Sequence, residues 1–432
     1  MTAYRDIVIA GGGMVGASLA LQLAAVLPQT VSICLVEGFP LPAPLAQGKP
    51  EYHPSFDARS TALSYSSRLV YEKIQVWDEL REWLCPIESI HVSSRGHFGS
   101  SLLRAGDYGW SALGYVVENA WLGNALVQAL YRQGRVEIIS PARVAAAIPE
   151  GRGMKLRLEG GAETVLETAL LLVADGAASG LREQLGVAVQ EKPYGQHALV
   201  ANVAFAQPHK GCAYERFTDQ GPVALLPLLA SSPGEHRSGL VWTLSAREAM
   251  HLQACPEQEF LQALQDRFGY RLGRMLQVGE RHCYPLSLVQ SAEQVRQGVV
   301  VMGNAAHSLH PVAGQGFNLA LRDVAELSAV LARGASAGQA LGDLALLQGY
   351  LRRQQPDQDR TIQFSDRLPG LFMHSDPVLG LARDLALSGL DILPGLKRAF
   401  VRHATGVAAM AGAPGDTFEK TSDKTGTGRR NG

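Results

Sequence analysis

The sequence predicts a mixed α/β fold in which a parallel-sheet domain is interleaved with an antiparallel-sheet domain and followed by a helical region. Two glycine-rich segments, at 11–16 and 303–318, each follow a short apolar strand, which places both at strand ends of one sheet. Between about 183 and 285 the pattern changes to apolar strands separated by turn residues. The late return of a glycine segment therefore predicts that the first domain is assembled from separate stretches of the chain.

The parts of the two domains are expected to alternate along the 432 residues. The first domain takes 1–86, 119–182 and 287–335, the second takes 87–118 and 183–286, the helical region is 336–411, and a tail follows at 412–432. The tail is polar and rich in small residues, so we expect it to be disordered.

Apolar spacing also predicts individual elements. Helices are expected from Asp57 to about Leu84, at 119–133 and at 257–268. Strands are expected at 169–174, 197–206, 222–228, 238–245 and 276–284, with a hairpin-like pair at 142–147 and 154–166.

The first glycine segment has the spacing of a dinucleotide-binding turn, Gly11-Gly12-Gly13-Met14-Val15-Gly16. Gly11 permits the tight turn, Gly13 lets the backbone approach a pyrophosphate, and Gly16 allows close packing of the following helix. That helix begins near Met14, so the amides of Met14 and Val15 face the phosphates. The alternative is a glycine turn that binds no ligand.

A second strand, 31–36, ends at Glu37, about 20 residues past the glycines, where an acid grips ribose hydroxyls. Its carboxylate would repel a 2′-phosphate, which disfavours a 2′-phosphorylated nucleotide. Strand, turn, helix, strand and acid occur in this order, which favours a bound dinucleotide over an empty turn.

The second glycine segment, GNAAHSLHPVAGQGFN, runs from Gly303 to Asn318. The amides of Gly314, Gln315 and Gly316 open a helix, where they are well placed to stabilise an anion. Two glycine turns on one sheet indicate a single extended ligand held at both ends, and this favours FAD over NAD. The anion would then be the N1/O2 edge of the reduced ring.

Pro311 fixes the chain before the second turn and has no amide hydrogen of its own. His307 and His310 make a poor metal site without a third ligand, so we expect no metal and a structural or supporting role for both.

The composition excludes several classes of function. A formal charge of −1 gives no reason to expect a nucleic-acid partner. The five cysteines are scattered and never in Cys-x-x-Cys spacing, which is typical of reduced thiols in a cytosolic protein. The first strand starts by residue 6 and no run of about 18 apolar residues occurs. We therefore expect a cytoplasmic protein with neither a signal peptide nor a membrane-spanning helix.

The two glycine segments with Glu37, and the Asp175-Gly176 turn followed by Ser179 and Arg182, resemble the single-component FAD-dependent aromatic hydroxylases, the family of para-hydroxybenzoate hydroxylase. Three further segments resemble the ubiquinone-biosynthesis branch of that family: Arg59-Ser60-Thr61-Ala62-Leu63-Ser64, Glu215-Arg216-Phe217-Thr218 with Gly221-Pro222, and Tyr284-Pro285-Leu286. The resemblance covers residues 5 to 400.

The resemblance implies a role for each matching residue. The pyrophosphate of FAD would lie on the first glycine turn, and Glu37 would bind the adenosine ribose. Arg59 would lie along the phosphates and ribityl chain, although a surface arginine at a helix start is the alternative. Asp175 and Gly176 match a turn associated with FAD and the nicotinamide donor, although Asp-Gly also ends many ordinary strands.

The flavin ring would contact Gly314, Gln315 and Gly316, and Pro311 and Asn318 of the same segment would also belong to the cofactor site. One departure concerns Gly303-Asn304, since the family usually has Gly-Asp there. Asparagine still accepts a hydrogen bond from a ribityl hydroxyl but carries no charge. We predict that FAD binds, more loosely.

The activity implied is hydroxylation of a polyprenylated phenol by O2, with NAD(P)H reducing FAD and a flavin C4a-hydroperoxide attacking an electron-rich ring carbon. The alternatives are a sister ubiquinone hydroxylase acting at another ring position, a flavin oxidoreductase that inserts no oxygen, and a non-catalytic flavin subunit of a quinone-synthesis complex. The intact Gly314-Gln315-Gly316 favours catalysis.

The candidate substrate wall lies on the antiparallel sheet and comprises Phe217, Leu225, Pro227, Trp242 and Tyr284. Aromatic residues of this kind are also common in an ordinary core. His310 and Tyr284 are weak candidates for assisting deprotonation of the phenol.

A polyprenylated phenol resides in the bilayer, so access to the membrane is expected. Residues 377–411 combine many leucines with Lys397, Arg398 and Arg402. This pattern is compatible with a helix at the inner face of the membrane or one that binds other ubiquinone-biosynthesis proteins. A C-terminal helix packed on the protein explains it equally well.

Overall fold

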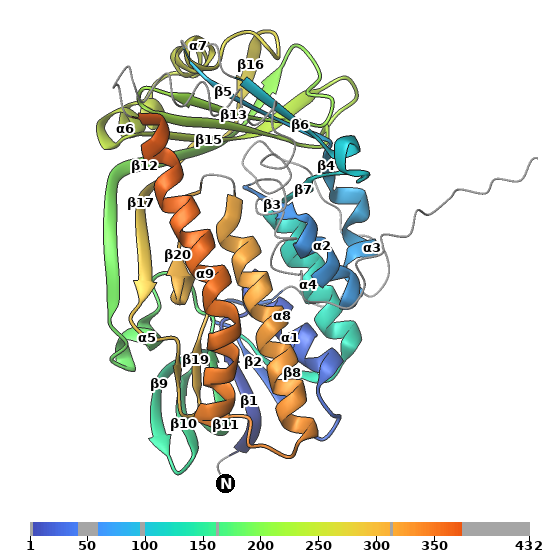
Figure 1. The fold of residues 1–432 in the computed structure, drawn as a ribbon, viewed down its shortest axis with the longest axis vertical. Coiled ribbons are helices and arrows are strands. Elements are labelled where there is room, and N and C mark those ends of the chain that lie inside the picture. The colour runs from blue at the N-terminus through green and yellow to red at the C-terminus, as the bar shows by residue number, and fades with distance from the viewer. Residues whose placement is uncertain (1–2, 42–58, 96–99, 161–163, 312–313, 374–432) are drawn as a thin grey trace, which may run out of the picture.

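A computed structural model describes residues 3–41, 59–95, 100–160, 164–311 and 314–373 (Figure 1). The tail at 412–432 and the segment 377–411 lie outside these residues. The mixed α/β fold class is confirmed: the chain forms one mainly parallel sheet, one mainly antiparallel sheet and a small third sheet. The boundaries between the domains stay a prediction.

The parallel sheet carries the first glycine turn. Its main strands, in spatial order, are β18 (Val295–Arg296), β19 (Val299–Val301), β11 (Val165–Val173), β1 (Ala3–Ala10), β2 (Ile33–Val36) and β8 (Val136–Ile139). A hairpin of β9 (Arg143–Glu150) and β10 (Gly153–Glu159) extends it beside β11. The central strands are runs of apolar residues because helices or the hairpin cover both faces.

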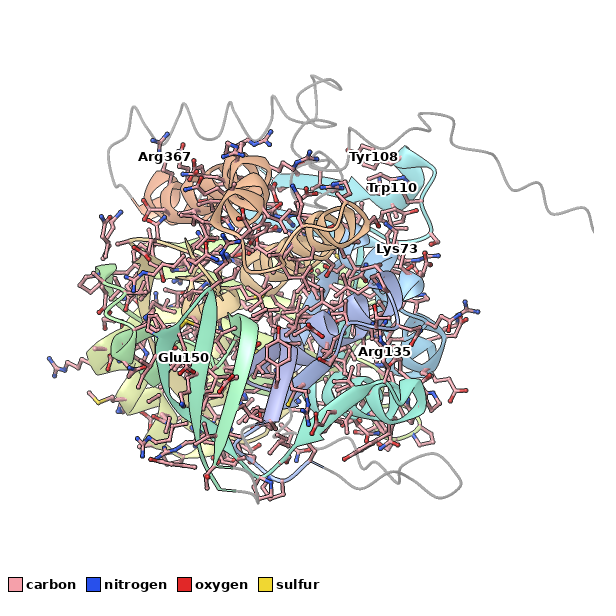
Figure 2. All side chains as sticks on the ribbon, turned by 90° about the horizontal axis from the view of Figure 1, so that it is seen from below. Lys73, Tyr108, Trp110, Arg135, Glu150 and Arg367 are labelled. Carbon is pink, nitrogen blue, oxygen red and sulfur yellow. The ribbon has the colours of Figure 1, made fainter. Side chains whose placement is uncertain are left out.

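Three helices pack on one face of this sheet, namely α1 (Met14–Val26), α4 (Asn119–Gln133) and α8 (Gln315–Ser336). Helix α9 (Leu344–Met373) runs beside α8 (Figure 1). The short α5 (Gly180–Gln184) lies with the hairpin on the other face. Arg135 closes the carboxyl end of α1 by donating to the carbonyls of Ala24 and Leu27, each at 2.8 Å (Figure 2).

The third sheet corrects one expectation. The stretch expected to be helical from Asp57 to Leu84 begins with a strand, β3 (Ser60–Ser64), which pairs with β7 (Gly114–Glu118) beside β4 (Cys85–Ile87). Helical structure follows only in α2 (Tyr65–Lys73), α3 (Trp77–Leu80) and the 3-10 turn η1 (Arg81–Trp83). The segment Ser60-Thr61-Ala62-Leu63-Ser64 contains hydroxyl residues that favour strands and caps over helix interiors, and Ser64 ends it as the N-cap of α2.

Within the described residues, the antiparallel sheet has nine strands. They are β5 (Ser89–Ser94), β6 (Ser100–Arg104), β12 (Val189–Phe205), β13 (Cys212–Thr218), β14 (Gly221–Pro227), β15 (His236–Ser245), β16 (Met275–Val278), β17 (His282–Ser291) and β20 (His307–Ser308). Helices α6 (Ala246–Ala254) and α7 (Glu257–Phe268) cover one face of the sheet. Helix α7 matches the helix expected at 257–268, whereas α6 was not expected. The other face looks toward β3, as the site below shows.

Candidate flavin site

The first glycine turn has the geometry of a phosphate-binding loop. Gly11 has φ +106°, and a Cβ there would lie 2.5 Å from the carbonyl oxygen of Ala174. A Cβ on Gly16 would lie 1.8 Å from the oxygen of Gly11. At Gly13, in contrast, a Cβ would meet no atom within 4 Å. Gly11 and Gly16 are therefore required by the turn itself, whereas Gly13 faces open space.

The amino end of α1 borders that open space. Gly13 is its N-cap, and no side chain caps the first amides of the helix. The first turn contains no acidic residue that would compete for them. Uncapped amides at the positive end of a helix favour an anion such as a pyrophosphate.

Glu37 lies directly beside the turn, at the end of β2. One of its carboxylate oxygens accepts a hydrogen bond from the amide of Gly12 at 2.5 Å, and the other accepts one from the amide of Phe39 at 2.8 Å. These bonds orient the carboxylate at the edge of the sheet, where a ribose next to the pyrophosphate would lie.

The second glycine turn meets the first. A Cβ on Gly303, which has φ +59°, would lie 3.2 Å from Cγ1 of Val15 on α1. The 3-10 turn η3 (Gly303–Ala305) carries Asn304, whose side chain is exposed. Arg182 of α5 is buried and holds the same turn in place by donating a hydrogen bond to the carbonyl of Ala305 at 2.9 Å. One ligand can therefore contact both turns.

Helix α8 presents a second uncapped amino end. Its N-cap, Gly314, has φ +59° and no side chain caps the helix. A Cβ on Gly314 would lie 3.3 Å from Cβ of Ala62 on β3, while one on Gly316 would meet no atom within 4 Å. Pro311 precedes this turn, and its carbonyl accepts the amide of Gly314 at 3.0 Å.

Asn318 secures this turn to β3. Its oxygen accepts from the amide of Ser64 at 2.8 Å and from the hydroxyl of Ser67 at 2.6 Å. Its amide nitrogen donates to the carbonyls of Ala62 and Gly314, at 2.8 and 2.7 Å. The Asn318 side chain is buried and fully used by the protein, so it positions the turn rather than reaching a ligand.

The Asp175-Gly176 turn lies at the same end of the sheet. It follows β11, and the Cα of Asp175 lies 2.9 Å from where a Cβ of Gly11 would be. Gly176 has φ +96°, and Asp175 is exposed. Ser179 then caps α5 by accepting from the amide of Arg182 at 3.0 Å.

Arg59 connects the nucleotide-binding side to the antiparallel sheet. Its Nη1 donates to the hydroxyl of Tyr284 at 2.9 Å, and its guanidinium carbon lies 5.8 Å from the centre of that ring. Arg59 is exposed and directly precedes β3. The sequence placed these two residues in separate roles, and the structure brings them together.

The two histidines of the second glycine segment contact different partners. His307 Nε2 lies 2.8 Å from Asp323 of α8, whose other oxygen accepts from Gln358 at 2.9 Å. His310 packs edge-on against the ring of Tyr194, with 5.1 Å between ring centres. Burial lowers the pKa of His310 to about 4, so its neutral imidazole is a weak proton acceptor for a phenol.

Strand pairing divides the candidate substrate wall between two faces. Leu225 and Trp242 lie in the core under α6 and α7, where Trp242 meets Phe260 edge-on. Pro227 alternates with Leu225 and belongs to the same face. These three residues therefore do not lie on the face turned toward the flavin site, and their prediction as substrate-wall residues is wrong. The long apolar strands show no alternation of apolar and polar residues from which the face could be predicted.

Phe217 and Tyr284 lie on the other face, which we call the inner face. Cross-strand pairs place Tyr284 beside Ala198, Ala198 beside Thr243, and Phe217 beside Pro222. Val241 and Gly239 are two residues apart on β15, so they share this face. A Cβ on Gly239 would lie 2.7 Å from the hydroxyl of Ser60 on β3. The inner face therefore looks toward β3 and the second glycine turn.

Glu215 is an inner-face residue to which the sequence assigned no role. It pairs with Ala224 on one side and Val92 on the other. Burial raises the pKa of its carboxyl to about 7. The available signal was its position two residues before Phe217 in a short strand, since alternate residues share a face.

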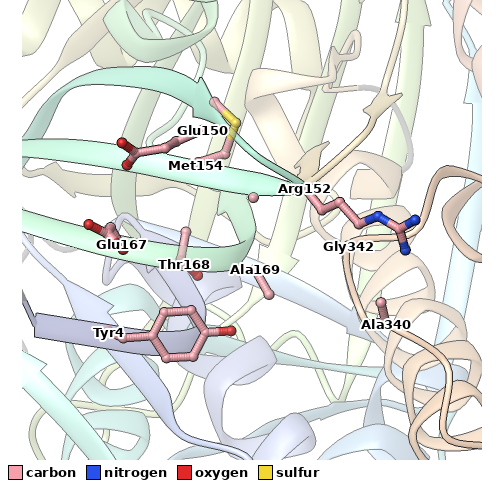
Figure 3. Close-up of a pocket in the computed structure, with 10 residues that line it drawn as sticks. Tyr4, Glu150, Arg152, Met154, Glu167, Thr168, Ala169, Ala340 and Gly342 are labelled. Atoms are coloured by element: carbon pink, nitrogen blue, oxygen red, sulfur yellow. The ribbon is translucent and has the colours of Figure 1, made fainter.

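A separate hollow of about 260 Å³ lies at the opposite end of the parallel sheet (Figure 3). It is bordered by Tyr4 at the start of β1, by Glu167 and Thr168 of β11, and by Arg152 of the hairpin turn. The glycine turns follow the carboxyl ends of the same strands, so this hollow is not part of the site.

Comparisons with known proteins identify the family and the fold. A family model described as an FAD binding domain matches residues 109–365. The p-nitrophenol 4-monooxygenase PnpA of Pseudomonas putida has a similar structure, with a TM-score of 0.72 and 17% identity over 94% of this chain and 99% of that one. PqsL of Pseudomonas aeruginosa gives a TM-score of 0.70 with 22% identity, over 86% and 97%. Fold and site together define an FAD-dependent aromatic-ring monooxygenase.

Sequence relatives narrow the class. Ubiquinone hydroxylase UbiL of Rhodospirillum rubrum is 34% identical over 414 residues, covering 95% of this chain and 91% of the relative. The 3-demethoxyubiquinol 3-hydroxylase of Escherichia coli is 30% identical over 403 residues, covering 93% and 98%. This chain belongs to the ubiquinone-biosynthesis branch of the FAD-dependent aromatic hydroxylases.

Proposed function

We propose that this chain hydroxylates the ring of a polyprenylated phenol, converting 2-octaprenyl-6-methoxyphenol to 2-octaprenyl-6-methoxy-1,4-benzoquinol with O2 and NAD(P)H. One observation carries the proposal. Two helices begin at glycine turns without a side-chain cap, Gly303 packs on Val15 of the first helix, and Gly314 packs on β3, which in turn contacts the inner face of the antiparallel sheet. This arrangement suits a flavin with its ring directed at that face.

The residues at the first turn would hold the adenine half of FAD. The open space at Gly13 and the free amides of Met14 and Val15 suit the pyrophosphate. Glu37 would exchange its bond to the amide of Gly12 for bonds to ribose hydroxyls. Arg59 would supply a cation near the phosphates.

The residues at the second turn would hold the flavin ring. When bound, FAD supplies the reduced flavin that activates O2 for insertion into an aromatic ring. The amides of Gln315 and Gly316, at the positive end of a helix of 22 residues, would stabilise the negative charge of the reduced ring. Gly303 and Asn304 would lie by the ribityl chain, and Asp175 with Gly176 by the nicotinamide donor.

The inner face would hold the phenol and keep water away. Phe217 is buried and Tyr284 is partly exposed on this face, with small or apolar residues at Ala198 and Pro222 between them. Exclusion of water favours transfer of oxygen to the ring over its loss as hydrogen peroxide.

The proposal for which ring position is hydroxylated rests on two sequence segments. The strands containing Glu215-Arg216-Phe217-Thr218 and Tyr284-Pro285-Leu286 support hydroxylation of the 6-methoxyphenol. The second candidate is a sister step, and the similarity to an Escherichia coli enzyme named for position 3 favours it.

Quinone intermediates in cells lacking this gene would test the assignment. We expect 2-polyprenyl-6-methoxyphenol to accumulate and ubiquinone to fall, with rescue by the wild type and not by Gly13→Val. Accumulation of another ring intermediate would move the enzyme to the sister step. Unchanged ubiquinone in a strain without a paralogue would contradict a role in the pathway.

We also propose peripheral contact with the inner face of the membrane, because the octaprenyl tail of the substrate resides in the bilayer. Among the described residues, no helix is long and apolar enough to cross a membrane. The segment 377–411, on which a docking helix was predicted, lies outside those residues. Flotation of the purified protein with anionic liposomes, or co-purification with other ubiquinone-biosynthesis proteins, tests this proposal, and failure of both contradicts it.

A further inference from the structure

Glu215 stands out on the inner face because its carboxylate has no partner. Among the described residues, no hydrogen bond or ion pair is formed by this side chain, which is neither fully buried nor fully exposed. It lies in the middle strand, β13, between β5 and β14. A carboxylate held in a protein recess without a partner is costly unless a ligand or its own protonation compensates.

The row of side chains through Glu215 defines where it points. Strand register places Val92, Glu215, Ala224, Val241 and Val200 side by side across five strands. The same register puts Phe217 and Gly239 on this face. Tyr214 points the other way and meets Phe268 of α7 edge-on. Glu215 therefore faces the nucleotide-binding domain, as Phe217 does.

The distance to the flavin turn is short. Gly239 contacts β3 at Ser60, and Gly314 contacts the same strand at Ala62, two residues or about 7 Å further on. Glu215 lies two strands from β15, which is about 10 Å across the sheet. A phenol ring lying between the sheet and the second glycine turn would thus be within reach of the Glu215 carboxylate.

The surroundings of Glu215 carry little charge. Its neighbours along and across the sheet are Val92, Ala213, Phe217 and Ala224, none of them ionisable. Among the described residues of the inner face, the ionisable groups lie on other strands or already have partners. His282 is four strands away, Arg237 pairs with Glu118, and the hydroxyl of Tyr284 accepts a hydrogen bond from Arg59. Helix α9 also approaches β13 and β14, and its Asp366 is held by Lys192. Burial alone raises the pKa of the Glu215 carboxyl.

We propose that Glu215 binds the hydroxyl group of the phenol and accepts its proton during hydroxylation. This inference rests on the proposed function. The O–H bond of the phenol breaks and its proton passes to the Glu215 carboxylate, while the O–H electron pair moves into the ring. The ring carbon then bonds the oxygen atom that the monooxygenase reaction supplies from O2 and NAD(P)H. Loss of the ring proton to water restores the aromatic ring and returns the electron pair to the phenol oxygen, which takes its proton back from Glu215.

Equilibrium binding without turnover tests the proposal. The probes are 2-allyl-6-methoxyphenol and its O-methyl ether, which cannot donate a hydrogen bond, titrated against the FAD-bound protein by calorimetry from pH 5.5 to 8. The ionised carboxylate accepts the bond, so the phenol should bind about 10-fold to 30-fold more tightly at pH 8 than at pH 5.5. Binding of the ether should change less than twofold.

Two variants and a control complete the test. Glu215→Gln should abolish the pH dependence of phenol binding, and Glu215→Asp should retain it. Glu191→Gln removes an exposed carboxylate of β12 in the same sheet and should behave as the wild type. If Glu215→Gln does not retain FAD, the comparison of phenol with ether on the wild type still decides.

Equal pH profiles for phenol and ether on the wild type, or an unchanged profile in Glu215→Gln, would overturn the proposal. Because no turnover is measured, these results are independent of which intermediate accumulates in cells. Loss of the proposed ring step with normal phenol binding would thus contradict the proposed function and leave the role of Glu215 in binding.

Discussion

Gly13 and Gly16 differ in what a new side chain would meet. We predict that Gly13→Val folds normally but loses at least about tenfold in FAD affinity, because the valine occupies the phosphate space. Gly16→Ala should instead destabilise the protein by about 3 kcal/mol or more, since its Cβ would overlap the backbone of Gly11. Flavin content and urea unfolding of both variants check this, and full flavin content in Gly13→Val would contradict it.

Asn318 gives a second prediction at this scale. Asn318→Ala removes four hydrogen bonds from a buried position, so we expect a loss of about 2–4 kcal/mol in the free energy of unfolding. Asn318→Asp keeps the two acceptor contacts and should cost less than Asn318→Ala. If the alanine variant is as stable as the wild type, Asn318 does not secure the turn.

His310 should make stability depend on pH. Its pKa is lowered from 6.5 to about 4, so the unfolded chain binds the proton more tightly, and stability falls as pH drops from about 6.5 toward 4. The groups around it are Tyr194 and Asp366, which is paired with Lys192. From pH 7 to 4.5, the wild type should lose about 2 kcal/mol more than His310→Gln in urea unfolding.

The raised pKa of the Glu215 carboxyl affects the pH dependence of stability in the opposite direction to His310, over part of the same pH range. The folded protein holds the Glu215 proton up to about pH 7, so this group removes stability as pH rises from its unfolded pKa toward 7. Glu215→Gln should therefore be relatively more stable than the wild type at pH 8. Parallel pH profiles for the two proteins would contradict this expectation.

At the scale of elements, local signals predicted the glycine turns and long-range packing decided the rest. The turn at 11–16 could be predicted from the sequence because two of its requirements are local: Gly11 has φ +106°, and a Cβ on Gly16 would overlap the carbonyl oxygen of Gly11. Strand β3 could not be predicted from the sequence, because its place depends on pairing with β7, about 50 residues later. The sequence also did not show that Phe217 lies on the inner face and Trp242 on the opposite face, because both residues are apolar and each face of the sheet is covered.

At the scale of the whole molecule, a buried ion pair joins the antiparallel sheet to the third sheet. Arg237, fully buried on the inner face of β15, donates to Glu118 at the end of β7 at 3.1 Å. Glu118→Ala leaves a buried guanidinium without its partner, so we expect a loss of about 3–5 kcal/mol. The matched control is Glu159→Ala, which breaks an exposed pair with Arg143 and should cost far less, because solvent screens this pair. Equal melting temperatures for both variants would contradict a bridging role.

The interleaving of the sheets has a consequence during synthesis. Strand β1 lies at the start of the chain, yet β19 joins the same sheet through β11 only after residue 299, and α8 follows from Gln315. A nascent chain on the ribosome therefore completes the adenine end of its cofactor site long before the flavin end exists. Until the last third of the protein emerges, residues 171–173 of β11 lack their neighbouring strand β19, so this stage of translation is the one most exposed to aggregation and most dependent on chaperones.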